Sequence, residues 1–390
     1  MASFLKVINL FNNTRTTTNT SYTSIADREP VWYYDSADYD GVDFVKLHAS
    51  FRAASGDTAA MIVSDLANNN INASEITTTS TVNVDVVSGD FYADLTTATD
   101  YRVRFKRAAG SGTESFDKAN IIFKQTNPTK TVTIIELGED NNVPSTSYSA
   151  PADYGIFKYD SDMFDGTVSI FLEADLHCNA SGNTAYSALY DITGATQVAS
   201  SEVSHTGNTN TTRKRSSAIT LTNGNEYRPD IKGSTTSEDV QAVKIIIKQT
   251  GTINKTATYI PMVNSPSSGT ETSYTAQNRY FTFNASDFDA TTKNFYHEAT
   301  FKVTANTGYA RLYNDTDTTE LDVRNTTSTS YTRSRSTALT MPNDDSNALN
   351  NYRKIDTSGT VTHGRTFLIV ELDWTSTTVN HNSLLLLGVG

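Results

Sequence analysis

A repeat of 126 residues constrains this chain more than any other feature of its sequence. Tyr22, Tyr148 and Tyr274 lie in the segments TSYTS, TSYSA and TSYTA, at two equal spacings of 126 residues. A Tyr-Arg dipeptide follows in each block, at positions 101, 227 and 352. Self-similarity at a fixed period is the signature of tandem units. The sequence therefore predicts three homologous domains at residues 1–128, 129–253 and 254–374, followed by a segment 375–390.

Each block has the sequence pattern of strands rather than helices. Residues 44–51, 168–176 and 295–303 alternate or stay apolar over strand lengths, and none keeps a helical period. Clusters of Gly, Asn, Asp and Ser separate such runs at short intervals. We therefore expect an all-β protein built from three tandem β-sandwich domains of the jelly-roll or Greek-key type, each of about 125 residues.

Composition excludes several classes of function. The net charge of −12 argues against a nucleic-acid-binding surface, which needs clustered Lys and Arg. No apolar run approaches the roughly 20 residues that span a bilayer, so we expect no membrane insertion. The first residues lack the basic region and cleavage site of a signal peptide. Cys178 is the only cysteine, so core packing must hold the domains without an intrachain disulfide.

One apolar run recurs at the boundaries of the blocks and is found four times in the chain. The copies are residues 4–10 (FLKVINL), 131–137 (TVTIIEL), 256–263 (TATYIPMV) and 379–390 (VNHNSLLLLGVG). Either the first or the last copy is surplus, depending on whether the run begins or ends a block. The surplus strand either pairs back onto the third block or is donated to another subunit by β-augmentation. The candidate assembly residues are Phe4, Leu5, Val7, Leu384, Leu385, Leu386 and Leu387.

A short motif supports the sandwich class. In blocks 1 and 2 a tyrosine follows a leucine by six residues, from Leu95 to Tyr101 and from Leu221 to Tyr227. This spacing resembles the tyrosine corner of fibronectin-type-III and other Greek-key sandwiches, in which the Tyr hydroxyl bonds the backbone a few residues upstream. The resemblance implies a corner at Tyr352 in block 3 as well, remodelled there by an Asn/Asp-rich insertion at residues 343–351.

A charged pair varies in concert between the blocks. One strand position carries His48, Glu173 and Glu298, and blocks 2 and 3 also carry two arginines each, where block 1 has Val-Ser-Gly at residues 87–89. We predict structural ion pairs between neighbouring strands rather than an anionic-ligand site on the arginines. The predicted pairs are Glu173 with Arg213 or Arg215, and Glu298 with Arg333 or Arg335.

Acidic turns are the candidate metal sites. Each block has two aspartates beside Gly or Ala, and oxygen-rich turns of this kind can hold Ca²⁺. The spacing of an EF-hand is absent, and turns favour Asp and Gly for conformational reasons alone. We therefore expect no cofactor, and the calcium candidates are Asp38, Asp40, Asp162, Asp165, Asp287 and Asp289.

The sequence contains no recognisable catalytic constellation. The six His make no metal-ligand spacing, and neither a nucleophile elbow nor a phosphate-binding loop is present. We predict that the protein is not an enzyme. Trp32, Tyr33 and Tyr34 form the densest aromatic cluster, which could stack on sugars, although strand aromatics more often belong to a core.

Two functions remain. The Thr/Asn-rich tandem sandwich pattern resembles structural proteins of phage tails and capsid surfaces and of bacterial surface filaments. This resemblance implies a non-enzymatic protein of a virion or an extracellular filament, whose partners are itself and other structural proteins. The alternative is a multivalent adhesin that binds glycans through repeated weak sites.

Overall fold

The computed structural model describes residues 2–12, 14–24, 30–207, 211–236, 238–263, 267–277 and 279–375. Within these ranges the regular elements are β-strands and four single-turn 3-10 helices. The C-terminal run at residues 379–390, with its candidate assembly residues Leu384, Leu385, Leu386 and Leu387, lies outside the described residues.

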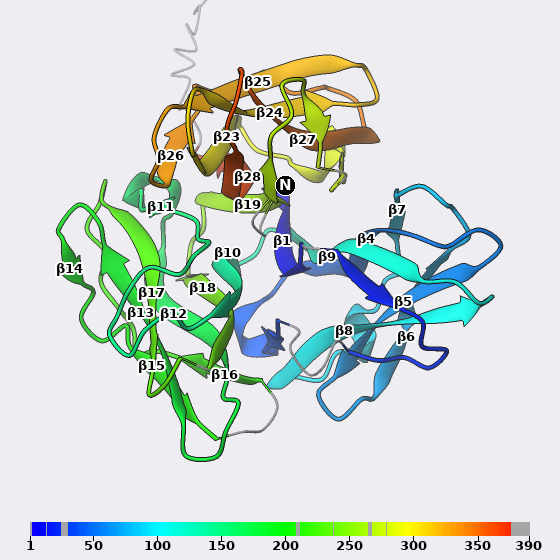
Figure 1. Ribbon diagram of the computed structural model, residues 1–390, viewed down its shortest axis with the longest axis horizontal. Coiled ribbons are helices and arrows are strands. Elements are labelled where there is room, and N and C mark those ends of the chain that lie inside the picture. Colours follow the sequence, from blue (N-terminus) through cyan, green and yellow to red (C-terminus); the bar gives the residue numbers. More distant parts are fainter. Residues whose placement is uncertain are drawn as a thin grey trace, which may run out of the picture.

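The strands form six antiparallel sheets that pair into three sandwiches (Figure 1). Sandwich 1 contains β1 (Ser3–Phe11), β2 (Arg15–Thr17), β3 (Trp32–Tyr34), β4 (Val42–Arg52), β5 (Thr58–Asp65), β6 (Asn70–Thr78), β7 (Val84–Val87), β8 (Thr99–Ala109) and β9 (Glu114–Thr126). Its short helices are η1 (Ser36–Asp38) and η2 (Tyr92–Asp94).

Sandwiches 2 and 3 repeat this order of elements. Sandwich 2 contains β10 (Lys130–Asn142), β11 (Phe157–Lys158), η3 (Ser161–Met163), β12 (Thr167–His177), β13 (Thr184–Asp191), β14 (Thr196–Gln197), β15 (Val203–Thr206), β16 (Thr212–Arg215), β17 (Glu226–Gly233) and β18 (Asp239–Thr250). Sandwich 3 contains β19 (Lys255–Val263), β20 (Ser267–Gly269), β21 (Thr275–Ala276), β22 (Phe281–Phe283), η4 (Ala285–Asp287), β23 (Thr292–Val303), β24 (Gly308–Asn314), β25 (Thr319–Thr326), β26 (Thr332–Arg335), β27 (Asn347–Ile355) and β28 (Val361–Asp373).

Each sandwich has the strand order of a jelly roll. In sandwich 1 one sheet runs β1-β9-β4-β7 and the other β3-β8-β5-β6, so the first strand pairs with the last. Sandwiches 2 and 3 repeat these orders, beginning with β10-β18-β12-β16 and β19-β28-β23-β26. We call the sheet that contains the first strand the axial sheet and its partner the outer sheet. The predicted fold class, all-β with three tandem sandwiches, is confirmed.

The leading run begins each sandwich. β1 pairs with β9, β10 with β18 and β19 with β28, each within one sandwich. Each leading strand is interrupted at the same place by a bulge, between Asn9 and Phe11, Glu136 and Gly138, and Pro261 and Val263. The repeat therefore extends to backbone irregularities, and the last of the four apolar runs is the surplus copy.

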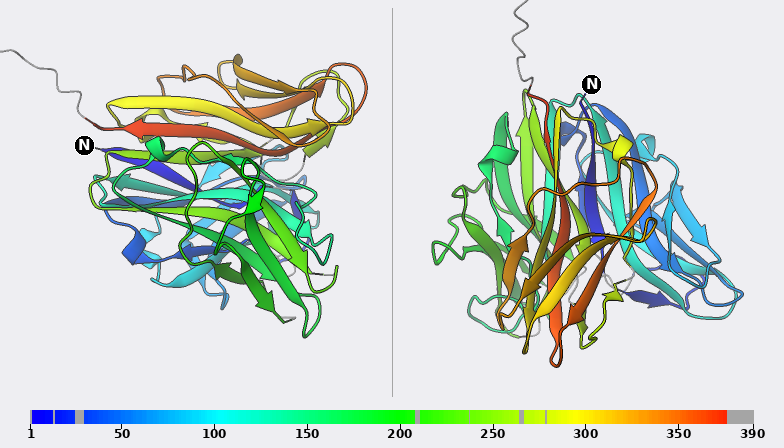
Figure 2. Two further views of the ribbon diagram at one scale, coloured as in Figure 1. Left: turned by 90° about the vertical axis from the view of Figure 1, so that its left-hand side faces the viewer. Right: turned by 90° about the horizontal axis from the view of Figure 1, so that it is seen from above.

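The three leading strands meet along one axis, and the sandwiches close a ring around it (Figures 1 and 2). Each hydrophobic core extends into the next sandwich. The core of sandwich 1 includes Val132 and Ile246 of sandwich 2, and the core of sandwich 2 includes Tyr259 and Ile369 of sandwich 3. Phe4, Leu5, Val7 and Ile122 of sandwich 1 complete the core of sandwich 3.

This sharing explains why the leading strands are apolar on both faces. One face packs into its own sandwich and the other into the preceding one, so an alternating pattern would bury polar groups. Phe4, Leu5 and Val7 are accordingly buried inside the chain. Their predicted role in assembly between subunits is wrong, because they join sandwich 1 to sandwich 3 of the same molecule.

Candidate functional site: the axis and the joints between sandwiches

A buried lysine ties all three sandwiches together at the axis. Lys6 on β1 is 2% exposed, and its Nζ donates to Thr133 Oγ1 of sandwich 2 at 2.7 Å. It also donates to Thr256 Oγ1 and the carbonyl of Ala257 in sandwich 3, at 2.8 and 2.6 Å. All three acceptors are uncharged, and burial lowers the pKa of Lys6 well below its ordinary value. In register, the counterparts of Lys6 are Thr133 and Thr258.

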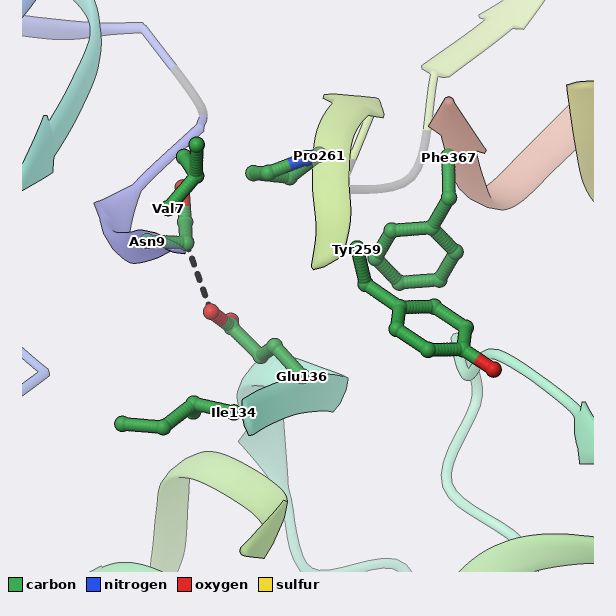
Figure 3. Close-up of a pocket in the computed structure, with 7 residues that line it drawn as sticks. All are labelled: Val7, Asn9, Ile134, Glu136, Tyr259, Pro261 and Phe367. Atoms are coloured by element: carbon green, nitrogen blue, oxygen red, sulfur yellow. Dashed lines mark hydrogen bonds between the residues drawn. The ribbon is translucent and has the colours of Figure 1, made fainter. Parts of the chain in front are cut away.

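A small polar cavity lies next along the axis (Figure 3). Asn9 Nδ2 donates to Glu136 Oε2 at 2.6 Å, and the two side chains face each other across the junction of β1 and β10. The cavity measures about 10 Å³ and is otherwise lined by Val7, Ile134, Tyr259, Pro261 and Phe367. Burial, and then the neighbouring carboxylate of Glu139, raise the pKa of Glu136 to about 8. The axis therefore holds two buried titratable side chains, Lys6 and Glu136.

Two joints between sandwiches carry an acid–arginine–acid triad. Between sandwiches 1 and 2, Arg213 NH1 lies 3.0 Å from Glu173 Oε2, and its Nε donates to Asp100 Oδ1 across the joint at 2.6 Å. Arg215 NH2 lies 2.7 Å from the same Glu173 oxygen. Burial raises the pKa of Glu173, but Arg215, Lys244 and Arg213 outweigh it and hold the pKa below its ordinary value.

The triad recurs between sandwiches 2 and 3. Arg333 NH2 donates to Glu298, and its NH1 lies 3.4 Å from Glu226 of sandwich 2. Asp100 and Glu226 are counterparts, since each directly precedes the repeated tyrosine at 101 or 227. Arg335 instead stacks over the ring of Tyr296, 3.9 Å from its centroid. The structure thus brings together the acids and arginines singled out in the sequence, and adds an acid from the neighbouring sandwich to each pair.

The third joint, between sandwiches 3 and 1, carries a histidine where the others have Glu and an aspartate where they have Arg. His48 Nε2 lies 3.2 Å from Asp85 Oδ2, which also accepts from Thr282 Oγ1 of sandwich 3 at 3.1 Å. The ring of Phe281 packs edge-on against His48. The assignment of residues 87–89 as the counterpart of the arginines holds at Val87, which takes the register position of Arg215, but it misses the counterpart of Arg213. Asp85 pairs in register with Ser50, as Arg213 pairs with Asp175, so block 1 replaces the arginine by an acid.

Backbone groups are also held across the joints. At the first joint the N–H of Val31 donates to Asp175 Oδ2 at 3.0 Å, and Lys244 Nζ donates to both Asp175 and the Val31 carbonyl, at 2.8 and 2.6 Å. At the second joint the N–H of Ile156 donates to Thr300 Oγ1 at 3.0 Å. At the third, Lys118 Nζ donates to the carbonyl of Tyr280 at 3.2 Å. Each of the three joints therefore has at least one hydrogen bond between a backbone group and a side chain of the neighbouring sandwich.

The acidic turns bind protein groups at these same joints. Asp40 accepts from the N–H groups of Thr129 and Lys130 at 2.7 and 2.9 Å, which fixes the connection between sandwiches 1 and 2. Asp165 holds the next connection in the same way. Asp38 and Asp287 form cross-joint ion pairs with Lys248 and Lys124, at 2.6 and 3.1 Å.

The two remaining acids take no such position. Asp162 is exposed, and Asp289 meets Ser3 through backbone hydrogen bonds. No group of three or more His, Cys, Asp or Glu residues suited to a metal ion occurs in the described ranges.

Two of the three predicted tyrosine corners form. The hydroxyl of Tyr101 accepts from the N–H of Thr96 at 2.7 Å, and Tyr227 does the same with Thr222 at 2.7 Å. The corner at Tyr352 is wrong. Tyr101 and Tyr227 pair with the last residues of β5 and β13, and the corresponding position opposite the last residue of β24 holds Leu349.

The insertion at residues 343–351 is the cause of this shift. Buried Leu349 fills the core position that tyrosine takes in the other two sandwiches. Tyr352 lies three residues further along β27, and its hydroxyl donates to Asp315 at 2.6 Å.

The aromatic cluster belongs to the core and to the first joint. Trp32 and Tyr34 are 1% and 3% exposed, and Tyr33 lies beneath Arg213, 4.0 Å from the ring centroid. The cluster therefore takes the core position that the sequence favoured, and it is not a sugar-stacking platform. The repeated tyrosines of the TSY segments lie elsewhere, near the outer sheets. Tyr22 donates to Glu75 at 2.5 Å and packs under Lys106, and the same triad is formed in sandwich 2 by Tyr148, Glu202 and Lys232.

Comparisons with known proteins identify no family, since neither a family model nor a curated protein matches this chain. Among solved structures, one of Sulfolobus turreted icosahedral virus aligns at 12% identity over 96% of this chain and 91% of that chain, with a TM-score of 0.21. An archaeal virus structure described by its triple jelly roll fold and turret assembly aligns at 10% identity over 94% and 91%, with a TM-score of 0.19. The VP2 subviral particle of infectious bursal disease virus aligns at 12% identity over 63% and 73%, with a TM-score of 0.17. TM-scores this low carry no argument about this chain.

A membrane-spanning helix is also not found. Among the described residues no helix combines the length and the apolar character needed to cross a bilayer.

Proposed function

We propose that this chain is a non-enzymatic structural protein that self-assembles into a virion or an extracellular filament. The observation that carries the proposal is the closed ring, in which three jelly rolls share their cores around a buried axis. Three domains that complete one another's cores form one block of fixed shape. Jelly rolls serve as capsid and as lectin domains, so the fold class alone does not decide the function.

The polar groups at the axis and joints support the role of a rigid block. Lys6, Asp175 and Lys244 are almost fully buried and bond groups of other sandwiches. Burying such groups contributes little net stability, because desolvation offsets the attraction, but it penalises every other arrangement of the domains. A subunit that must repeat the same contacts many times in a symmetric assembly needs such a defined shape.

Sedimentation and electron microscopy of the purified chain over a range of concentrations test this function. The proposal predicts regular shells, rings or filaments above a threshold concentration. A chain that stays monomeric up to high concentration, alone and with the other proteins of its source, contradicts it.

A glycan-binding adhesin is the second candidate, and the outer sheet of sandwich 3 favours it. A ladder of partly exposed aromatics follows β24 and β27, formed by Tyr274, Tyr309, Tyr313 and Tyr352. Arg311 already lies 3.9 Å from the ring centroid of Tyr274 and 4.6 Å from that of Tyr352, so a sugar would have to displace it. A glycan array distinguishes the two functions: binding that Tyr274→Ala and Tyr352→Ala abolish supports the adhesin.

A further inference from the structure

The strand β7 is an edge strand of sandwich 1, and its residue Asp85 also faces the joint with sandwich 3. It is the terminal strand of the axial sheet and pairs with β4, and no other strand of the described chain joins it. Large hydrophobic side chains are exposed at three described positions, and all three lie in sandwich 1: Leu66 at 39%, Val82 at 66% and Val87 at 46%. Val87 is the last residue of the edge strand, and Val82 lies two residues before its start. An exposed apolar edge is a template for an added strand.

The corresponding edges of the other two sandwiches are guarded by charge. β16 and β26 are the terminal strands of their axial sheets, as β7 is. They carry Arg213, Lys214 and Arg215, and Arg333 and Arg335, whereas the segment around β7 reads Val82-Asn-Val-Asp-Val-Val87. Charged side chains on an edge oppose the approach of a further strand. The three homologous edges therefore differ in charge, and β7 carries the fewest charged side chains of the three.

The chain also contains a strand-like segment for which the ring has no place. Residues 379–390 are the fourth copy of the leading run, and β1, β10 and β19 already fill the three leading positions. The connections that lead into β10 and β19 lie at one end of the ring axis, which we call the axial end. Trp374 lies at the same end, beside Ala2 and Pro128. Residues 376–378 reach at most about 11 Å from this point.

The edge strand begins much further away. The β4 residues that pair with β7 are His48 to Phe51, whereas the axial end of β4 is Val42. Six residues of strand separate them, which is about 20 Å. The eight residues 376–383 extend to at most about 28 Å, so the length of the tail allows its four leucines to meet β7 of the same copy or of a neighbour, and the proposed self-assembly selects the neighbour.

We propose that β7 is the acceptor edge for residues 379–390 of a second copy of this chain. The inference rests on the proposed structural function and names the contact through which copies join. The four leucines of the run lie against the apolar Val82–Val87 edge, and the backbone of the run satisfies the open hydrogen-bonding edge of β7. Each copy gives one strand and accepts one, so the contact is heterologous and propagates into a ring or a filament.

Cross-linking between two single-cysteine variants tests the contact. Full-length Val87→Cys is mixed with full-length Leu386→Cys and treated with a short bismaleimide; the native Cys178 is buried in both. The proposal predicts a cross-linked heterodimer as the main product. Arg215→Cys, at the register position of Val87 in sandwich 2, is the matched control and should cross-link at least tenfold less. Equal yields for both acceptors would overturn the proposal. So would a link that the double variant Val87→Cys/Leu386→Cys forms only within single chains at high dilution.

A second variant separates this inference from the proposed function. Val87→Arg restores the residue of its register counterpart Arg215, and Val82→Lys adds a second basic side chain just before β7. The full-length double variant should lose association while its melting temperature stays within about 3 °C. If wild type assembles and the variant assembles equally well, the acceptor edge is wrong and the structural function stands. If wild type never assembles, the structural function itself is lost.

Discussion

Lys6 Nζ lies 2.7 Å from Thr133 Oγ1, although the two residues belong to different sandwiches. Both occupy the same position of the leading strand, and the third counterpart is Thr258. A long side chain with an amino group at one of three equivalent places breaks the symmetry of the axis. It therefore distinguishes sandwich 1 from the other two and favours one order around the ring.

Removing this side chain should destabilise the whole molecule. Lys6→Ala leaves a cavity on the axis and removes the donor from three buried acceptors, which should cost about 2–4 kcal/mol. Lys158→Ala, at an exposed position of β11, is the control and should change the unfolding free energy by less than about 0.5 kcal/mol. Urea unfolding measures both. Equal midpoints for the two variants would show that the axis contributes nothing.

In the triad at the first joint, Arg213 should couple more strongly to Glu173 than to Asp100. Glu173 is buried, so the double-mutant cycle of Arg213→Ala with Glu173→Ala should give a coupling of about 1–3 kcal/mol. Asp100 is partly exposed, and its coupling to Arg213 should stay below about 1 kcal/mol. Two similar coupling energies would contradict this ranking.

Glu136 should make stability depend on pH. Its pKa in the folded chain is raised to about 8, above the ordinary value of 4.5. Because the pKa is raised, Glu136 stays protonated to a higher pH in the folded state than in the unfolded state. Its contribution to the free energy of unfolding is therefore complete below pH 4.5 and is lost as the pH rises towards 8. In that window wild type should lose up to about 1.4 kcal/mol per pH unit relative to Glu136→Gln, which cannot ionise. Parallel melting curves for the two chains from pH 4.5 to 8 would rule this out.

The two true tyrosine corners should differ from Tyr352. Tyr101→Phe and Tyr227→Phe each remove a buried hydroxyl that bonds a backbone N–H, at a cost of about 1–2 kcal/mol. Tyr352→Phe removes a hydrogen bond made by a partly exposed side chain on β27 and should cost less than about 0.5 kcal/mol. Thermal unfolding of the three variants checks the order, and a Tyr352 variant as unstable as the others would restore a third corner.

The fold class was predictable because apolar periodicity and turn residues repeat three times, each copy supporting the others. Comparing blocks also exposed Glu173 with its arginines, since both members of a pair changed together. The comparison of blocks failed where equal spacing in the sequence does not correspond to the same register position in the sheet. The insertion in block 3 leaves Tyr352 at the expected distance from Tyr227 but moves Leu349 into the corner, and Asp85 was missed because its charge is reversed.

Closure of the ring was not predictable from the sequence. Short connections between sandwiches are equally compatible with a row of domains, and nothing local in FLKVINL shows that Lys6 meets Thr133. The continuous apolar character of the leading strands was the available signal, since a strand with one exposed face would alternate.

Closure is the central claim, and the contact between Ser3 and Asp289 tests it most directly. These residues form an antiparallel bridge between sandwiches 1 and 3, the one joint with no connecting segment. The double variant Ser3→Cys/Asp289→Cys should form an intrachain disulfide under mild oxidation, with an unchanged hydrodynamic radius. Ser3→Cys/Ser161→Cys, whose second site lies in an η3 turn of sandwich 2, should not. A closed ring predicts the first disulfide within single chains, whereas its absence, or its formation only between chains, would contradict the account.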